Sequence, residues 1–284
     1  MQVNKMKGTM LSLVLGVALC FMLFPGLTQA QPSLVFAVHP FKKPDQLKKM
    51  FNPLIEYLQK ETGAAIEFRS GKDYAAVESA MVSGEAHISY MGPSLYAATK
   101  ANHPGAVQAL GVIRKKGITT FKGVIVAKDG SAINSVADLK GKKFAFGDRH
   151  STLSAYMPAY MLMQAGVFES LDYKFIGSHD NVAKGVLAGA FDAGGIKPEV
   201  AANYVGKGLK IVAESDPVEN HVLVISSKVD KEMITKMQAA VRKLNDPAVL
   251  QAIAKSADAF VEPNDAGYDK LLQIMKQVDV KIPL

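Results

Sequence analysis

The chain has 284 residues, a formal net charge of +7 and 49% hydrophobic residues, which is enough length and apolar content for two compact lobes. Its positive charge is spread along the chain rather than gathered in lysine and arginine runs. This distribution argues against a nucleic-acid-binding protein and suits a protein with an anionic ligand.

Residues 1–30 have the pattern of a secretory signal peptide. Lys5 and Lys7 precede an apolar run over about 10–24, and small residues lead to Ala30. We expect cleavage after Ala30 and secretion of the remaining chain. The apolar run approaches the ~18 residues of a membrane span, so an uncleaved membrane anchor is the alternative.

The single cysteine, Cys20, lies in this segment. A lipoprotein is a further alternative, but Leu19 is larger than the residue usually found before a lipidated cysteine. Without residues 1–30 the chain has no thiol, so we expect no disulfide, no thiolate nucleophile and no thiolate metal ligand.

Strands and helices alternate from residue 34 to residue 113. Short apolar runs predict strands, and apolar residues at helical spacing predict the helices between them. This alternation is typical of βαβ units and a mainly parallel sheet. The predicted strands are 34–39, 65–68, 88–91 and 107–113, and the predicted helices begin at Pro44, Asp73 and Pro93.

The pattern changes near residues 115–117, and the rest of the chain predicts a second lobe. Apolar strands at 123–127 and 221–226 have no adjoining helix and are interpreted as connecting strands. After residue 226 the pattern predicts only helices, at 231–244, 247–256 and 265–277. Between the connecting strands we predict strands 144–146, 173–176, 191–196 and 209–213, with helices from about 151 and over 181–188.

This order predicts an α/β protein with two lobes joined by a hinge. Residues 31–118 and 225–284 would form the first lobe, and residues 119–224 would be inserted as the second.

The segment 144–163 joins a buried strand to a helix and is the centre of the functional interpretation. Its apolar residues keep helical spacing after Ser151 and Thr152, so one of these two is the natural N-cap. A helix N-terminus offers unpaired N–H groups and a positive dipole end, which together can bind an anion. Arg149 and His150 would add positive charge. The alternative, favoured by this segment alone, is an ordinary capped helix.

Five segments, in this order, carry a family resemblance: PDQLKKMFNPLIEYLQKETG, ISYMGPSLYAA, VADLKGKKFAFGDRHSTLSAYMPAYML, GSHDNVAKGVLAGAFDAG and ESDPVENHVLVIS. With them the chain resembles the periplasmic solute-binding proteins of phosphate, phosphite and phosphonate ABC transporters. The resemblance implies a type II periplasmic binding fold. In this fold each lobe is a βα sheet with helices on both faces, a two-strand hinge joins the lobes, and the ligand lies in the cleft between them.

The family binds the oxygens of a tetrahedral oxyanion with a Ser-Thr-Ser run at a helix start. Ser151 and Thr152 match this run, whereas Leu153 replaces its third residue. Leu153 keeps its N–H group, and Ser154 is a candidate to supply the missing hydroxyl.

The resemblance implies further ligand contacts. Tyr90 and Ser94 would contact the ligand from the first lobe, although packing at a strand end and an ordinary first-turn serine are the alternatives. His179 would donate a hydrogen bond to the ligand, where a lone histidine is more often a cap or a surface residue. Lys197 stands where relatives that bind amino-phosphonates tend to have an acid, so a ligand at Lys197 should lack an amino group. The alternative for Lys197 is a solvated loop residue. Phe41, after the first predicted strand, is either an apolar wall of the cleft or a core residue.

The implied function is that of a periplasmic substrate-binding component of an ABC transporter, which captures the oxyanion and delivers it to an inner-membrane permease. We expect a monomer with no catalytic residue, no cofactor, no metal and no nucleic-acid partner. A sensory partner of a membrane histidine kinase would use the same fold and site and is the alternative. An enzyme acting on a phosphorylated small molecule is less favoured, because the chain has no G-x-S-x-G elbow, no H-E-x-x-H and no P-loop.

Overall fold

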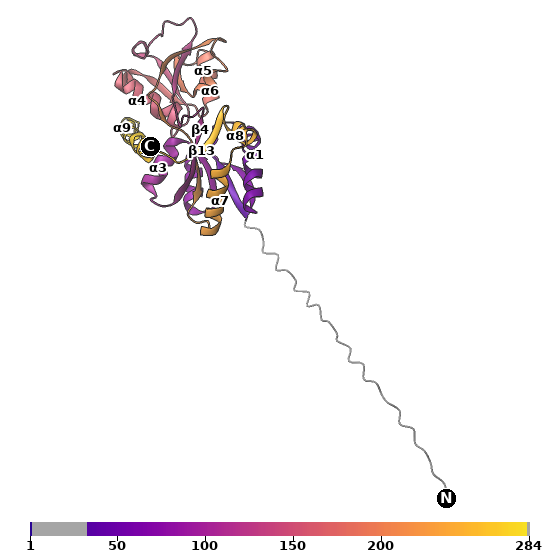
Figure 1. Ribbon diagram of the computed structural model, residues 1–284. Coiled ribbons are helices and arrows are strands. Elements are labelled where there is room, and N and C mark those ends of the chain that lie inside the picture. The colour runs from indigo at the N-terminus through magenta and orange to yellow at the C-terminus, as the bar shows by residue number, and fades with distance from the viewer. Residues whose placement is uncertain (2–32, 283–284) are drawn as a thin grey trace. The chain divides into compact units, whose positions relative to one another are not determined.

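The computed structural model describes Met1 and residues 33–282 (Figure 1). The predicted signal segment therefore lies outside the described residues, except for Met1. Residues 31–284 cluster as one compact unit. Within this unit the strands form two large sheets and one small one. No described helix has both the length and the apolar content that crossing a membrane requires.

Segments from both ends of the unit build the first sheet, which has the strand order β13-β4-β12-β3-β1-β2. β1 pairs in parallel with β2 and β3, whereas β12 runs antiparallel between β3 and β4. The sheet is thus mixed: the four strands predicted over residues 34–113, β1 to β4, run in one direction, and the two opposed strands, β12 and β13, come from the C-terminal part of the chain. The bounds are β1 Ser33–Val38, β2 Ala65–Ser70, β3 Ile88–Met91, β4 Val107–Lys115, β12 Val222–Ser226 and β13 Ala257–Val261.

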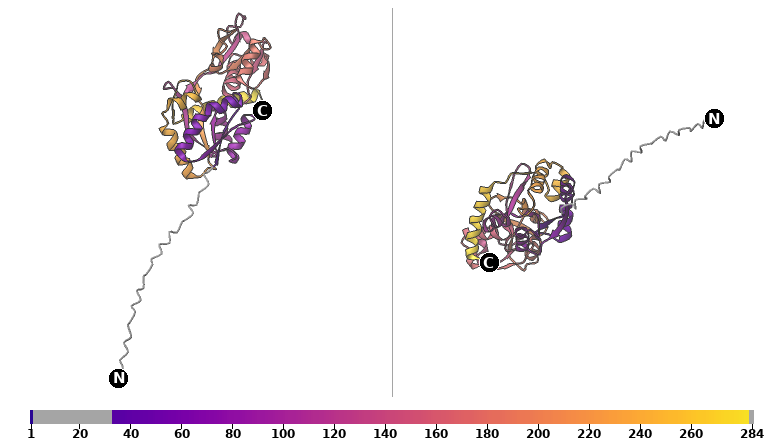
Figure 2. Two further views of the ribbon diagram at one scale, coloured as in Figure 1. Left: turned by 90° about the vertical axis from the view of Figure 1, so that its right-hand side faces the viewer. Right: turned by 90° about the horizontal axis from the view of Figure 1, so that it is seen from below.

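Helices cover both faces of the first sheet. One face packs against α1 (Pro44–Thr62), α7 (Lys231–Lys243) and α8 (Pro247–Ile253), with Phe36, Leu54 and Leu223 in a shared apolar cluster. The other face packs against α2 (Tyr74–Ser83), α3 (Pro93–Asn102) and α9 (Asp265–Lys281). Figure 2 shows α1 and α9 on opposite sides of this sheet in the view from below.

Local signals in the sequence account for most helix ends. Asp73 is the N-cap of α2, and its carboxylate accepts a hydrogen bond from the Ala76 N–H at 2.7 Å. Gly63 ends α1 in the left-handed region, with φ of 72°. In contrast, strand β13 contradicts the prediction of helices alone after residue 226. It is a short strand that pairs antiparallel with β4, and its five residues are too few to show a period.

The second sheet has the strand order β10-β6-β9-β7-β8. β7 pairs in parallel with β8 and β9, and β6 runs antiparallel between β9 and β10, so this sheet is mixed as well. Helices α5 (His179–Leu187) and α6 (Pro198–Ala201) pack on one face, and α4 (Met157–Gln164) on the other. The strand bounds are β6 Val124–Lys128, β7 Lys143–Phe146, β8 Asp172–Phe175, β9 Ala193–Ile196 and β10 Leu209–Glu214.

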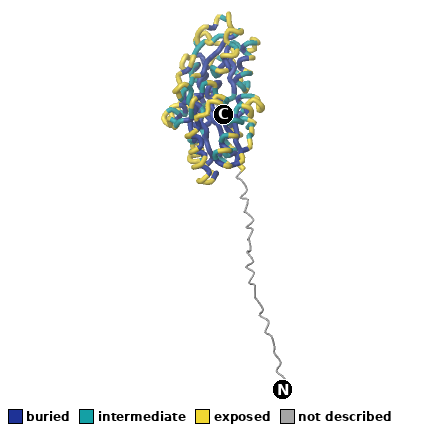
Figure 3. The backbone as a smooth tube through the Cα atoms, turned by 45° about the vertical axis from the view of Figure 1, so that its right-hand side comes forward, coloured by how far each residue is buried: buried dark blue, intermediate teal, exposed yellow. Residues whose placement is uncertain are grey.

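A two-stranded antiparallel ribbon connects the two sheets. It consists of β5 (Thr120–Phe121) and β11 (Val218–Glu219). The predicted connecting strands lie beside this ribbon, because β6 belongs to the second sheet and β12 to the first. The predicted lobe boundary at 224/225 falls inside β12, and the lobe boundaries stay a prediction. Figure 3 shows buried backbone along the middle of the molecule and exposed residues mostly at its periphery.

Candidate functional site

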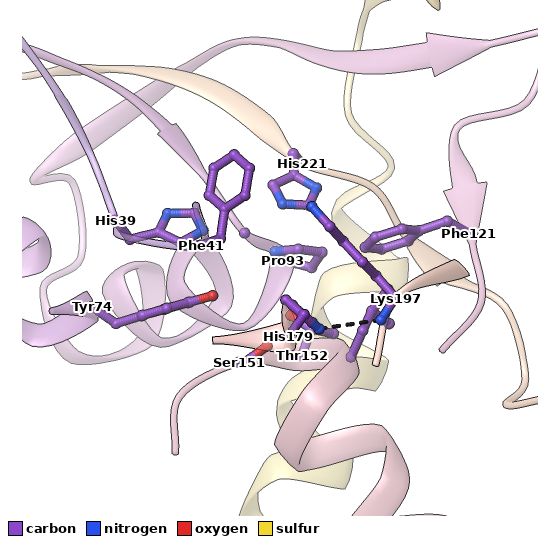
Figure 4. A pocket seen from close by; sticks show the side chains of 12 residues that line it. His39, Phe41, Tyr74, Pro93, Phe121, Ser151, Thr152, His179, Lys197 and His221 are labelled. Atoms are coloured by element: carbon purple, nitrogen blue, oxygen red, sulfur yellow. Dashed lines mark hydrogen bonds between the residues drawn. The ribbon is translucent and has the colours of Figure 1, made fainter. Parts of the chain in front are cut away.

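A small pocket lies where segments of both sheets and of the connecting ribbon meet (Figure 4). Its cavity volume is about 20 Å³. Three histidines and one lysine line it, and no acidic side chain does. The lining residues are His39, Phe41, Tyr74, Gly92, Pro93, Phe121, Ser151, Thr152, Leu153, His179, Lys197 and His221.

The sheet topology explains why these residues meet. His39 directly follows β1, Gly92 follows β3 and Lys197 follows β9. The carboxyl ends of parallel strands share one edge of a sheet, where loops and helix N-termini gather. One such edge from each sheet borders the pocket.

The helix that follows β7 begins as the sequence predicts but with a wider first turn. Ser151 is the N-cap, and its Oγ accepts a hydrogen bond from the Ser154 N–H at 3.3 Å. Residues Thr152–Tyr156 form a π-helical turn, named η2, in which the Tyr156 N–H donates to the Ser151 carbonyl at 3.1 Å. Pro158 has no N–H, and the Ser154 carbonyl accepts from the Gly147 N–H at 2.9 Å instead. π-Helical turns often occur at functional sites.

Thr152 connects this turn to the first sheet. Its hydroxyl accepts a hydrogen bond from the Ser94 N–H at 2.9 Å and donates to the Ser94 Oγ at 2.8 Å. The Ser94 hydroxyl in turn donates to the His150 carbonyl at 2.5 Å. Ser94 therefore lies behind Thr152 rather than in the pocket wall, because its side chain is used in this contact.

Ser154 and the two basic residues before the helix also lie outside the pocket lining. Ser154 is fully buried against Gly147, where an added Cβ would lie 2.1 Å from the Ser154 Oγ. The helical period turns this side chain toward the end of β7. Arg149 makes an ion pair with Asp279 at 2.6 Å, and His150 lies near Asp148.

His179 presents a defined hydrogen-bond donor to the pocket. The Lys197 N–H donates to its Nδ1 at 3.2 Å (Figure 4), so the proton of the neutral ring must be on Nε2. Burial lowers the pKa of His179 well below its usual value, and Lys197 and His39 act in the same direction. The ring is therefore neutral at physiological pH and can donate from Nε2.

Lys197 lies in the pocket wall and supplies positive charge to it. Its ammonium lies over the Phe41 ring, 4.5 Å from the ring centroid, which is a cation–π contact. Burial, opposed by Glu199 and aided by Lys42 and Lys115, lowers the pKa of Lys197 to about 8. Most Lys197 side chains are thus protonated at pH 7.

Two pocket histidines were not found by sequence reasoning. His39 is 1% exposed and lies 4.2 Å from the Tyr74 ring, centroid to centroid. Burial lowers the pKa of His39 to about 3, so its ring is neutral. His221 stacks on Tyr90 with 4.9 Å between ring centroids and 10° between ring planes. The only available signal for His39 was its position at the end of a predicted strand.

Tyr90 itself does not line the small pocket. It lies beside a neighbouring cavity of about 230 Å³, which Phe41, Lys197 and His221 also border. Tyr74, which sequence reasoning missed, has its hydroxyl near Ser151.

Of the eight predicted site residues, the pocket brings together five and leaves out Tyr90, Ser94 and Ser154. The five are Ser151, Thr152, Leu153, His179 and Lys197.

Metal coordination finds no support in the described residues, because no three His, Cys, Asp or Glu side chains among them are arranged to bind a metal ion. The pocket chemistry is instead that of an anion site. It combines a helix N-terminus, hydroxyls, a neutral imidazole donor and one ammonium, each of which binds oxygen atoms that carry negative charge.

Comparison with known proteins adds independent information. A family described as "ABC transporter, phosphonate, periplasmic substrate-binding protein" matches residues 36–268. The phosphate-import protein PhnD of Mycolicibacterium smegmatis is 29% identical over 224 residues, which are 72% of this chain and 70% of that protein. A probable ABC transporter phosphite-binding protein, PhnD1 of Prochlorococcus marinus, is 30% identical over 175 residues, or 58% of each chain.

Solved structures share the fold. The structure of PhnD1 from Prochlorococcus marinus in complex with methylphosphonate has a TM-score of 0.77 at 21% identity, and it covers 87% of this chain and 98% of that one. A binding-protein component of an ABC phosphonate transporter from Pseudomonas aeruginosa has a TM-score of 0.73 at 19% identity, with 88% and 89% covered. These are type II periplasmic binding proteins, as the sequence predicts for this chain.

Proposed function

Because the chain belongs to the phosphonate-binding family of periplasmic ABC-transporter proteins, we propose that its small pocket captures a tetrahedral phosphorus oxyanion. Phosphate, phosphite and the phosphonates are the candidate ligands. The family places the protein in the periplasm and gives it two partners, a small ligand and a membrane permease.

The observation that carries this proposal is the set of donors around one small cavity. The N-terminal turn at Ser151, Thr152 and Leu153 lies on the same pocket as the Nε2–H of His179 and the ammonium of Lys197. Donors that are fixed before the ligand arrives cost little reorganisation when they bind it. No carboxylate lines the pocket, and Glu199, which raises the pKa of Lys197 from outside it, is paired with Lys115.

The ligand should be compact and should lack an amino group. A cavity of about 20 Å³ gives little room for a long substituent on the central atom. The Lys197 ammonium would repel a ligand ammonium, and no acid lines the pocket to pair with one. Simple oxyanions and those with a small apolar substituent therefore fit better than aminoalkyl phosphonates.

Contacts between the two sheets support closure of the lobes around the ligand. We propose lobes of residues 31–118 with 225–284 and of residues 119–224, joined by the β5–β11 ribbon. The hydrogen bonds between Ser94 and Thr152 and the 2.6 Å ion pair between Lys115 and Glu199 join these lobes. Hinge closure is the usual motion of periplasmic binding proteins.

Other features of the proposal rest on the sequence and on the family. We propose that residues 1–30 are a cleaved signal peptide, and that the exported protein acts as a monomer without nucleic acid. We also propose that it binds its ligand without chemical turnover, since binding and release are what a transporter's binding component requires.

Calorimetric titration of ligand-free protein tests the proposal. The panel contains phosphate, phosphite, methylphosphonate, aminoethylphosphonate and sulfate, and phosphorus NMR of each mixture checks for turnover. Tight binding of a phosphorus oxyanion that is recovered unchanged supports the proposal. Folded protein that binds none of them, or that converts one of them, contradicts it.

A further inference from the structure

The protonation pattern of His221 is fixed by its neighbour Asn220. The backbone N–H of His221 donates to the Asn220 Oδ1 at 2.9 Å. A backbone N–H requires an acceptor, so the side-chain atom at this place must be the amide oxygen rather than the amide nitrogen. The same oxygen lies 3.1 Å from the His221 Nδ1. Nδ1 must therefore carry the proton, and Nε2 of the neutral ring has a free lone pair.

Asn220 is itself firmly placed. It is 1% exposed, and it lies between β11 and β12 in the segment that leads from the ribbon to the first sheet. Its N–H donates to the Thr119 carbonyl at 2.8 Å, and its carbonyl accepts from the Tyr268 hydroxyl at 2.7 Å. These bonds fix the backbone of Asn220, and its side-chain oxygen is held by the backbone N–H of His221.

The lone pair of His221 is directed toward the pocket. A Cβ added to Gly92, a pocket residue, would lie 3.9 Å from the His221 Nε2 and 3.7 Å from the His39 Nε2. Both Nε2 atoms thus border the space beside Gly92. The opposite ring nitrogen of His221 faces Asn220, away from that space.

Burial and the neighbouring basic side chains keep the His221 ring neutral, and the acid that shares a neighbouring cavity with it, Glu199, is paired with Lys115. Burial lowers the pKa of His221 well below its usual value, and His39, Lys197, Lys115 and His179 all act in the same direction. The rings packed on it, Tyr90, Phe41 and Phe121, bring no negative charge. The pocket therefore contains an acceptor, the Nε2 of His221, beside the donors of His179 and Lys197.

We propose that His221 determines which tetrahedral anions bind, because its bare Nε2 requires that one corner of the ligand is not an ionised oxygen. This inference rests on the proposed function. A protonated oxygen at that corner would donate a hydrogen bond to Nε2. A hydrogen or a methyl group there has no lone pair that would face the lone pair of Nε2. An ionised oxygen would instead meet the lone pair directly, and two acceptors repel each other. The pocket should accept monohydrogen phosphate, phosphite and methylphosphonate and reject sulfate.

The tautomer can be tested without any ligand. A long-range ¹H–¹⁵N NMR spectrum distinguishes protonated from bare ring nitrogens, and the His221→Gln variant assigns the His221 signals. We expect a proton on Nδ1 and a bare Nε2. A proton on Nε2 in the ligand-free protein would overturn the inference.

The selectivity is tested by titrating sulfate and phosphate into the wild-type protein, into His221→Gln and into His103→Gln, which changes an exposed histidine. Sulfate should bind the wild type at least about a hundredfold more weakly than phosphate, since sites built around one polar group of a ligand discriminate strongly. A glutamine amide can turn its N–H toward the ligand, so in His221→Gln the ratio of phosphate affinity to sulfate affinity should fall at least about tenfold. His103→Gln should leave it unchanged.

The outcomes separate this inference from the proposed function. If phosphate binds but sulfate binds equally well, or if His221→Gln keeps the wild-type ratio, the inference is wrong while the proposed function stands. If no anion of the panel binds, both are wrong.

Discussion

At the scale of single residues, the pocket relies on donors whose protons are fixed by their neighbours. The Lys197 N–H places the proton of His179 on Nε2, and Asn220 places that of His221 on Nδ1. One backbone bond thus makes His179 a donor, whereas one side-chain oxygen makes His221 an acceptor. Among the residues that line the pocket, Lys197 is the one with a charged side chain.

Replacing Thr152 by Val should weaken oxyanion binding at least about tenfold, because it removes the two hydrogen bonds to Ser94 that hold the helix start, whose N–H groups border the pocket, in place. Thr152→Ser, which keeps the hydroxyl, should restore most of the affinity, and Thr235→Val on the exposed side of α7 is the control. Calorimetry measures all three. Unchanged affinity in Thr152→Val would place the anion elsewhere.

Anion affinity should fall as the pH rises through about 8. The pKa of Lys197 is lowered to about 8, so its ammonium is present below this pH and is lost above it. The affinity ratio between wild type and Lys197→Met should therefore shrink from pH 7 to pH 9. Taking the ratio cancels any protonation of the ligand itself. A ratio that stays constant over this range would mean that Lys197 contributes no charge to binding.

Replacing Ser154 by Ala should leave anion affinity within about twofold of wild type. The Ser154 Oγ faces Gly147 and has no hydrogen-bond partner among the described residues. Removing a buried hydroxyl without a partner should also stabilise the fold slightly. Calorimetry and urea denaturation measure the two effects. A large loss of affinity would show that Ser154 contributes to the anion site.

At the scale of elements, the site depends on how the η2 turn packs against the end of β7. An alanine Cβ at Gly147 would lie 2.1 Å from the Ser154 Oγ and 2.9 Å from the Gly177 carbonyl oxygen. Both contacts are far shorter than van der Waals separations. The turn can therefore approach the strand end only because residue 147 is a glycine.

Gly147→Ala should destabilise the protein by ~1–3 kcal/mol, as overpacking of a tight contact does. Because the turn that moves contains Thr152 and Leu153, anion affinity should fall as well. Ser154→Gly in the same background removes the closest atom and should recover part of the stability. Urea denaturation of the single and double variants tests this. Equal stability of wild type and Gly147→Ala would refute the packing argument.

At the scale of the whole molecule, the pocket draws on both sheets and on the connecting ribbon. A ligand bound there should stabilise both lobes together. Any ligand that binds only the folded state adds about 4.1 kcal/mol at a thousand times its Kd. We expect calorimetric unfolding to show one transition that moves to higher temperature with phosphate. Two transitions, of which only one responds, would show that a single lobe binds the anion.

Much of the fold could be predicted from local signals. The helices from Pro44, Pro93 and Lys231 begin where the sequence predicts. The sequence also limited the N-cap to Ser151 or Thr152, because a cap acts on N–H groups only two or three residues away, and the structure shows Ser151 in this role. The type II binding fold, with its two-strand hinge, came from the resemblance of five ordered segments. Strand β13 was missed, because its sequence, ADAFV, has no continuous apolar run of the kind that marked the other strands.

The sequence by itself thus determined the family, the alternation of strands and helices, and the helix start that can bind an anion. Each of these depends on neighbouring residues or on their order. Only the tertiary structure decided which side chains meet. Sheet order and the β5–β11 ribbon bring His39, Tyr74 and His221 to the helix start. The π-helical turn directs Ser154 away from the pocket. Side-chain direction depends on contacts between distant segments, and no local pattern in the sequence records those contacts.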